Sequence, residues 1–149
     1  MYELLELLKK YQANSVVFAN TAHGFHWNVE GPLFAQYHEL FGDIYSDVDG
    51  TIDTIAEWMR AFDVQAPYTL QQLLAAQDFG DTETVSNSPI VMSRMLLLMN
   101  EKIIADIKDI FDGADAAREQ GLADFLSGRI AAHQKWSWML KSSIKQTIN

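Results

Sequence analysis

Apolar residues recur at spacings of three and four along most of the chain, which is the period of an amphipathic α-helix. Four long stretches follow this pattern, at about residues 4–25, 34–62, 88–120 and 122–144. Each stretch carries its apolar residues on one face. The pattern therefore predicts an all-α protein built from four long helices, with no internal repeat and no second domain within residues 1–149.

The breaks between these stretches predict how the helices are connected. Gly31 interrupts the pattern after the first helix, and Pro32 suits the first turn of the second, with Phe34 in its buried stripe. Because this gap is short, the first two helices should be antiparallel neighbours. The segment 63–89 is much longer and contains an apolar stretch at 70–76 that predicts a short helix. One long, partly helical connection in the middle favours a ferritin-like four-helix bundle over a simple up-down bundle.

Composition narrows the class of protein. The chain has no cysteine, which excludes disulfides and thiolate metal sites. No apolar run approaches the roughly 18 residues of a membrane span, and the opening residues alternate apolar and charged side chains, unlike a signal peptide. We therefore expect a cytoplasmic protein that does not enter a membrane. The net charge of −9 argues against a surface that neutralises nucleic-acid phosphates.

The second predicted helix carries an acidic pair that faces away from its apolar stripe. Asp53 and Glu57 are four residues apart, so their carboxylates can converge on one cation. A solvated outer face is the ordinary alternative for such a pair. Gly42, Ser46 and Gly50 recur beside the two acids at the same spacing. Glycine within a helix costs roughly 0.5–1 kcal/mol relative to alanine, so these residues suggest close packing against a second copy of the helix. Random tolerance of small residues on an exposed face is the alternative.

Helix geometry sets a limit on how one chain could bind a metal. His38 precedes Asp53 by 15 residues, which is about 22 Å along a helix axis. If two copies of this helix pair antiparallel across a two-fold axis near Ser46, His38 of one copy lies beside Asp53 and Glu57 of the other. His26, just before the chain reversal, would join from the same side. Such mixed imidazole–carboxylate sites suit iron, manganese or zinc.

The residues that raise this possibility also carry a family resemblance. The main motif comprises His26-Trp27-Asn28-Val29, Gly31, Phe34, His38-Glu39, Asp53 and Ala56-Glu57. It resembles the signature of the Dps family, the small twelve-subunit ferritins, and the resemblance spans nearly the whole chain. A weaker match comprises Ala123-Asp124, Leu126, Lys135 and Trp138. The Glu-x-x-His motif that ordinary ferritins carry in the bundle core is absent from the sequence, which favours an intersubunit site.

The resemblance implies a ferroxidase centre at a dimer interface. His26 and His38 would come from one subunit, and Asp53 and Glu57 from its partner. Such a protein oxidises Fe(II), preferably with hydrogen peroxide, and stores ferric mineral inside a hollow dodecamer built from two-fold dimers. Family members often have an aspartate where this chain has Gly42, and Asp43 is displaced from that position by 100° around the helix. The second iron position should therefore be weaker or filled through water.

The resemblance also raises the question of DNA binding. Many family members carry a lysine-rich N-terminal extension that binds DNA, whereas this sequence offers only Lys9 and Lys10 near its start. We therefore expect weak or absent DNA binding. Two alternatives stay open: a Dps-like architectural protein that protects DNA, and a non-catalytic shell protein whose ferroxidase sites are impaired at Gly42.

The remaining candidate residues have a structural and a functional interpretation. His23 is either a hydrogen-bonded surface group or an accessory ligand, and His133 is expected to be a satisfied core group. Trp27 and Trp136 are expected to be packing residues, with an electron relay as the alternative role for Trp27. Acidic residues around the turn into the last helix form either a solvated surface or an iron entry route, namely Asp112, Asp115, Glu119 and Asp124.

Overall fold

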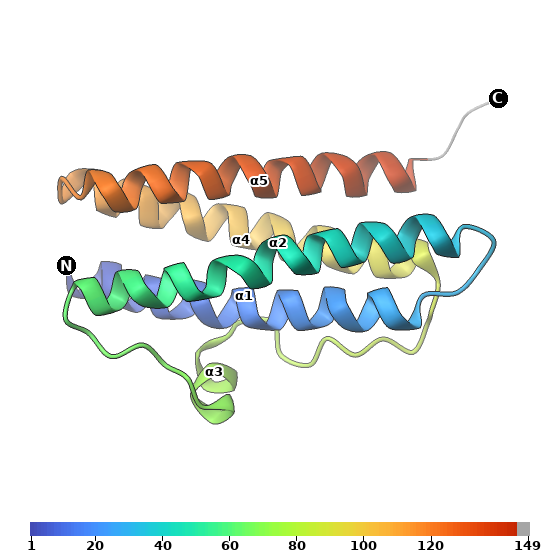
Figure 1. Cartoon of the computed structure of the whole chain (residues 1–149), viewed down its shortest axis with the longest axis horizontal. Coiled ribbons are helices and arrows are strands. Elements are labelled where there is room, and N and C mark those ends of the chain that lie inside the picture. Colours follow the sequence, from blue (N-terminus) through green and yellow to red (C-terminus); the bar gives the residue numbers. More distant parts are fainter. Residues whose placement is uncertain (146–149) are drawn as a thin grey trace.

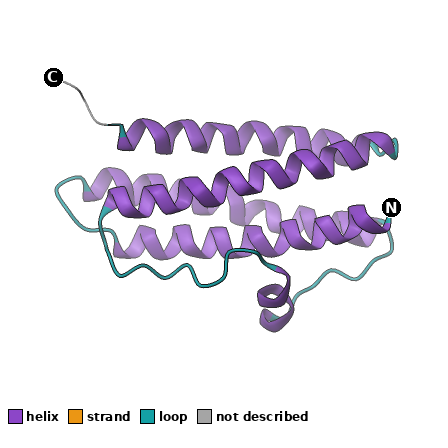
Figure 2. Ribbon diagram, turned by 180° about the vertical axis from the view of Figure 1, so that it is seen from behind, coloured by secondary structure: helices purple, strands orange, loops and turns teal. Residues whose placement is uncertain are grey.

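Residues 1–145 form four long helices and one short one. The computed structural model describes residues 1–145 and contains α1 (Tyr2–Asn28), α2 (Phe34–Ala61), α3 (Leu70–Ala76), α4 (Pro89–Ala116) and α5 (Gln120–Ile144). Those residues include no strand (Figure 2). The all-α class, the four long helices and the short helix at 70–76 were all predicted from the pattern and are confirmed. None of the described helices combines the length and apolar composition needed to cross a membrane.

The helices pack as two antiparallel pairs. Figure 1 shows α1 beside α2 and α4 beside α5, and α1 also packs against α4. The connection between α2 and α4 runs the length of the bundle, so α4 starts at the end opposite to the one where α2 finishes (Figure 1). This crossover makes α2 and α4 parallel, which is the arrangement of a ferritin-like bundle.

The crossover is held against the side of the bundle by its short helix. α3 packs on α1. A capping box starts α3: the Thr69 side chain accepts from the backbone N–H of Gln72, and the Gln72 side chain accepts from the backbone N–H of Thr69. Farther along the crossover, Asp78 accepts from the side-chain amide of Asn14 on α1. These contacts fix the connection without adding a layer to the bundle.

One hydrophobic core lies between the four long helices. Its largest fully buried side chains come from α1, α2 and α4, and include Phe18, Phe41, Ile55, Leu96 and Ile107. The predicted buried stripe of α2 is therefore largely confirmed.

Two expectations at the start of α2 are wrong. Phe34 is 42% exposed, because the first turn of α2 projects past the packed part of the bundle. Pro32 lies in the preceding turn, since the helix begins at Phe34 with Leu33 as its N-cap.

A polar clamp joins α2 to α5 across the core. Asp47 accepts two hydrogen bonds from the guanidinium of Arg129 (2.9 and 2.8 Å) and one from the indole N–H of Trp136 (2.7 Å). Burial raises the pKa of Asp47, but the hydrogen bonds from Arg129 and Trp136 outweigh burial and hold that pKa below its usual value. We call these three residues the Asp47 clamp.

His133 lies fully buried beside the Asp47 clamp. Its Nδ1 and the side-chain oxygen of Asn100 are 2.7 Å apart, and the Asn100 amide donates to the His133 carbonyl and to the Ser137 hydroxyl. Burial, together with the nearby charge of Arg129, lowers the pKa of His133 to about 3, so this side chain is neutral at ordinary pH. The prediction that His133 is a satisfied core group is confirmed.

Candidate metal centre

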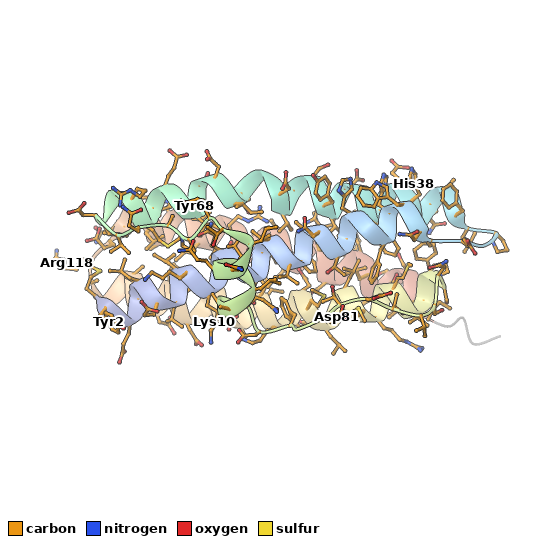
Figure 3. All side chains as sticks on the ribbon, turned by 90° about the horizontal axis from the view of Figure 1, so that it is seen from below. Tyr2, Lys10, His38, Tyr68, Asp81 and Arg118 are labelled. Atoms are coloured by element: carbon orange, nitrogen blue, oxygen red, sulfur yellow. The ribbon has the colours of Figure 1, made fainter. Side chains whose placement is uncertain are left out.

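The two histidines of the main motif meet at the end of the bundle where α1 turns into α2. His26 lies in the last turn of α1, and His38 lies near the start of α2, at the end opposite Tyr2 and Arg118 (Figure 3). The reversal between the helices is short and contains Gly31 at φ +132°, a backbone conformation that residues other than glycine rarely adopt. The backbone N–H of Glu30 donates to the carbonyl of Asn87, which ties the reversal to the start of α4.

The imidazoles of His26 and His38 stack face to face. Their ring centroids are 3.7 Å apart, and the planes differ by 14°. Each ring also bonds to the other residue's backbone: His26 Nδ1 lies 2.5 Å from the His38 carbonyl oxygen, and His38 Nδ1 lies 2.6 Å from the His26 carbonyl oxygen. A carbonyl only accepts, so each Nδ1 carries the proton and each Nε2 keeps its lone pair. Both rings are thus held in the tautomer that binds a metal through Nε2.

Gly42 makes room for this arrangement. A Cβ atom at position 42 would lie 2.7 Å from His26 Nδ1 and 2.9 Å from His26 Cε1, closer than real Cβ atoms approach a ring. The sequence suggested that Gly42 admits a neighbouring backbone; in the structure it admits the imidazole of His26. A side chain at this position, including an aspartate, would require His26 to move. Gly50, by contrast, has nothing within 4 Å of its Cβ position and remains open.

The two acids lie on the exposed stripe of α2, as predicted. This stripe runs along the helix at alternating spacings of three and four and consists of Glu39, Asp43, Ser46, Gly50, Asp53 and Glu57. A hydrogen bond with Asp53, reinforced by the repulsion between the two carboxylates, raises the pKa of Glu57. The carboxyl groups of Asp53 and Glu57 therefore converge, and a cation between them would relieve their repulsion.

The acids and the histidines do not meet within one chain. His38 and Asp53 lie on the same straight helix, 15 residues apart, or about 22 Å along its axis. Among residues 1–145, no group of three or more histidine, aspartate or glutamate side chains is placed to hold a metal ion. One subunit therefore presents the imidazole pair and the carboxylate pair separately, as the two half-sites of the candidate metal centre.

A row of stacked rings extends from the imidazole pair along α1 and α2. Tyr45 stacks on His23 with centroids 3.7 Å apart and planes within 8°, and His23 lies 6.1 Å from His26. We call Tyr45, His23, His26 and His38 the ring row. These residues line an open surface depression together with Glu39, Gly42, Asp43 and Ser46. Sequence reasoning missed Tyr45, although its spacing of seven residues from His38 puts both on one helix face.

The other candidate residues are placed as follows. Trp136 is buried as expected, whereas Trp27 is 63% exposed and contacts the ring of His23, so its packing is confined to the surface. Asp112 and Asp115 are exposed near the end of α4, and Glu119 is the N-cap residue of α5. Asp124 is also exposed, in the first turns of α5. A role for these acids in iron entry stays a prediction.

Comparisons with known proteins agree with the fold. The family model described as "Ferritin-like domain" matches residues 5–148. The DNA protection during starvation protein of Brevibacillus brevis is 32% identical over 139 residues, covering 93% of this chain and 93% of that protein. The helix order and this match define a ferritin-like domain. The chain belongs to the Dps family of ferritin-like proteins.

Solved structures show the same fold. The X-ray structure of Dps from Thermosynechococcus elongatus superposes with a TM-score of 0.93 at 28% identity, covering 98% of this chain and 92% of that one. A Dps protein from Vibrio cholerae O1, described as a member of a broad superfamily of ferritin-like diiron-carboxylate proteins, gives a TM-score of 0.91 at 26% identity. That alignment covers 97% of this chain and 90% of that one.

Proposed function

We propose that this protein is a ferroxidase and iron-storage protein that oxidises Fe(II) with hydrogen peroxide and keeps the ferric product as mineral inside a hollow shell. The observation that carries the proposal is the division of the ligand set. Each subunit presents an imidazole pair at one end of the exposed face of α2 and a carboxylate pair near the other end. Two subunits paired antiparallel along this face would complete two identical pockets.

The chemistry of the four side chains suits this function. His26 and His38 offer Nε2 lone pairs, while Asp53 and Glu57 offer anionic oxygens, a mixture that suits iron. Carboxylates stabilise Fe(III) more than Fe(II), so the pocket favours the oxidised product. Hydrogen peroxide accepts two electrons and two protons to give two water molecules. If both electrons arrive at the pocket, no hydroxyl radical is released.

The exposed stripe of α2 supports the pairing of subunits. Ser46 lies near its centre, and Gly50 leaves open space where another helix could approach. A two-fold axis near Ser46 would bring His38 of one subunit beside Asp53 and Glu57 of its partner. We expect the two-fold dimers to assemble into a dodecamer. Light scattering should then give about twelve times the 16.9 kDa mass of the chain.

Iron oxidation tests the proposal directly. The native protein is titrated anaerobically with Fe(II), peroxide is added, and Fe(III) formation is followed by absorbance. The double variant His26→Ala/Asp53→Ala should lose the fast phase of oxidation, because each completed pocket lacks one imidazole and one carboxylate. The control is Asp109→Ala, which removes an exposed acid from α4 and should leave the rate unchanged. Equal oxidation rates in the native protein and the double variant would refute the ferroxidase function.

Two other functions predict different experimental results. The name of the relative from Brevibacillus brevis favours a DNA-protecting architectural protein, which would bind DNA whether or not its iron pockets are intact. Gly42 favours a non-catalytic shell, because it withholds a carboxylate from the pocket. Such a shell would show the mass of the assembly in light scattering but would oxidise iron no faster than the double variant.

A further inference from the structure

The ring row connects the imidazole pair to a side chain that can be oxidised. Tyr45 contacts His23 face to face at 3.7 Å, His23 is 6.1 Å from His26, and His26 stacks on His38 at 3.7 Å. No step between neighbouring rings in this row exceeds 6.1 Å. Imidazole is hard to oxidise, whereas a phenol can lose one electron and one proton. The row therefore has a possible electron donor, Tyr45, at the end away from His38.

The proposed pocket needs such a donor because of its ligand count. Two imidazoles and two carboxylates are enough protein ligands for one iron ion but leave few for a second. Gly42 adds no ligand, and the position of His26 over it leaves no room for one. One Fe(II) ion supplies one electron, whereas cleaving the O–O bond of hydrogen peroxide to two water molecules takes two. With one electron alone, the products are hydroxide and hydroxyl radical.

We infer that Tyr45 supplies the second electron through the ring row, an inference that rests on the proposed function. Fe(II) loses one electron and becomes Fe(III). The phenol of Tyr45 loses one electron and its proton and becomes a neutral phenoxyl radical. The O–O bond of hydrogen peroxide breaks, and with the phenolic proton and one further proton from solvent it gives two water molecules. A later Fe(II) ion, with a proton from solvent, restores the phenol.

The placement of Tyr45 suits this role better than that of Trp27, the other oxidisable ring beside His23. Trp27 meets His23 at 4.1 Å with planes tilted by 46°, and it is 63% exposed. Tyr45 lies within 8° of the His23 plane, which gives fuller overlap of the two π systems. Tyr45 is also half-buried against the hydrophobic core. A radical on Tyr45 is thus partly sheltered, while the open depression that it lines lets its proton leave.

Freeze-quench electron paramagnetic resonance tests the inference. The assembled protein is loaded anaerobically with Fe(II), mixed with hydrogen peroxide and frozen at successive times, with ring-deuterated tyrosine used to identify the radical. Tyr45→Phe removes the phenol and keeps the stacked ring. Tyr68→Phe, at a highly exposed position on the crossover, is the matched control. Trp27→Phe removes the competing donor, and His23→Leu interrupts the row while leaving Tyr45 in place. Fe(III) absorbance and a hydroxyl-radical spin trap are read in parallel.

We expect a tyrosyl signal in the native protein, in Tyr68→Phe and in Trp27→Phe. The signal should be lost in Tyr45→Phe and delayed in His23→Leu, while Fe(III) still forms and the hydroxyl-radical adduct increases. An unchanged tyrosyl signal in Tyr45→Phe, or a signal that only Trp27→Phe removes, would overturn the inference. Iron oxidation without any protein radical in the native protein would do the same and leave the proposed function standing. A native protein that oxidises no iron would overturn both.

Discussion

At the scale of single residues, the position of the His26 imidazole depends on the absence of a side chain at Gly42. The imidazole of His26 occupies the space that a side chain at position 42 would need, and this position lets it stack on His38 and bond to the His38 carbonyl. The sequence alone identified both histidines and the unusual glycine. It could not relate them, because the contact depends on the side-chain conformation of His26 and on the path of the reversal between α1 and α2.

Gly42→Ala should weaken metal binding to the imidazole pair. The added Cβ displaces the His26 ring, so the pair loses its stacking and its fixed tautomer, and affinity should fall about 10- to 100-fold, as for other lost supports of metal ligands. Cobalt(II) titration followed by visible absorption measures the affinity. Gly128→Ala is the matched control, since nothing lies within 4 Å of its Cβ position. Equal cobalt affinity in the two variants would contradict the proposed dependence.

His133 should make the stability of the fold depend on pH. Its folded pKa of about 3 lies below the ordinary value of 6.5, so the unfolded chain binds the proton more readily. Stability is full above pH 6.5 and falls as the pH drops toward 3. Between pH 7 and pH 4.5, the loss from this residue should be about 3 kcal/mol. His133→Gln, which can still donate to Asn100, should remove this part of the loss.

Urea unfolding of the native protein and of His133→Gln, at pH 7 and at pH 4.5, measures this loss of stability. The protein concentration is the same in all four experiments. All other residues are the same in both proteins, so their contributions cancel in the comparison. Identical pH dependence in the two proteins would show that His133 is protonated in the folded state as easily as in the unfolded chain.

At the scale of elements, α2 carries three different surfaces. Its apolar stripe packs in the core, Asp47 joins the clamp to α5, and the exposed stripe holds Asp53 and Glu57. Helical periodicity predicted the apolar and exposed stripes, because both follow directly from 3.6 residues per turn. It did not predict the Asp47 clamp, since nothing in the local pattern shows that Arg129, 82 residues later, lies opposite Asp47. The exposure of Phe34 was missed for the same reason: periodicity does not show where a neighbouring helix ends.

Asp47→Ala should destabilise the bundle by about 3 kcal/mol, because it leaves the buried guanidinium of Arg129 without its charged partner. We take the low end of the usual range, since Asp47 itself is partly exposed. The folded pKa of Asp47 is lowered, so the stabilisation is present above the ordinary carboxyl pKa and is lost as the pH falls through the folded value. Urea unfolding at neutral pH measures the effect, and Asp109→Ala should change stability by less than about 0.5 kcal/mol. A similar change in both variants would show that the clamp contributes little.

At the scale of the whole molecule, the proposed function depends on assembly, because the imidazole pair and the carboxylate pair lie apart on each subunit. The sequence predicted the ferritin-like bundle because helix lengths and the long crossover are readable from the pattern. It also predicted that one chain cannot gather the four ligands, because that limit is a distance along a straight helix. The partner geometry itself stays a proposal, since no residue pattern specifies how two copies dock.

Mixed assemblies should recover activity that neither parent has. One parent is His26→Ala/His38→Ala and the other is Asp53→Ala/Glu57→Ala. A hybrid dimer has one pocket with all four native side chains and one with none. After denaturation and refolding of an equal mixture, about a quarter of the native pockets should return, and with them about a quarter of the fast iron oxidation. No recovery, from parents that each assemble normally, would contradict an intersubunit site.

DNA binding should be weak. The net charge of the chain is −9, so an assembly repels phosphates. Lys9 already pairs with Glu6 (3.1 Å) and Lys10 with Asp78 (3.4 Å), which further reduces what these lysines can offer to DNA. A gel-shift assay at low salt without divalent metal should show no complex. A clear shift under these conditions would refute the expectation.

The outward direction of the Asp53 and Glu57 carboxylates has a consequence for a newly made subunit. Under the proposed pairing, a solitary subunit is catalytically silent, because neither of its half-sites retains the metal and oxidant together. The reaction would begin only after subunits associate, which is also when an enclosed interior exists to receive insoluble product. Synthesis of the polypeptide and onset of its redox chemistry would thereby be separated in time, without any additional regulator.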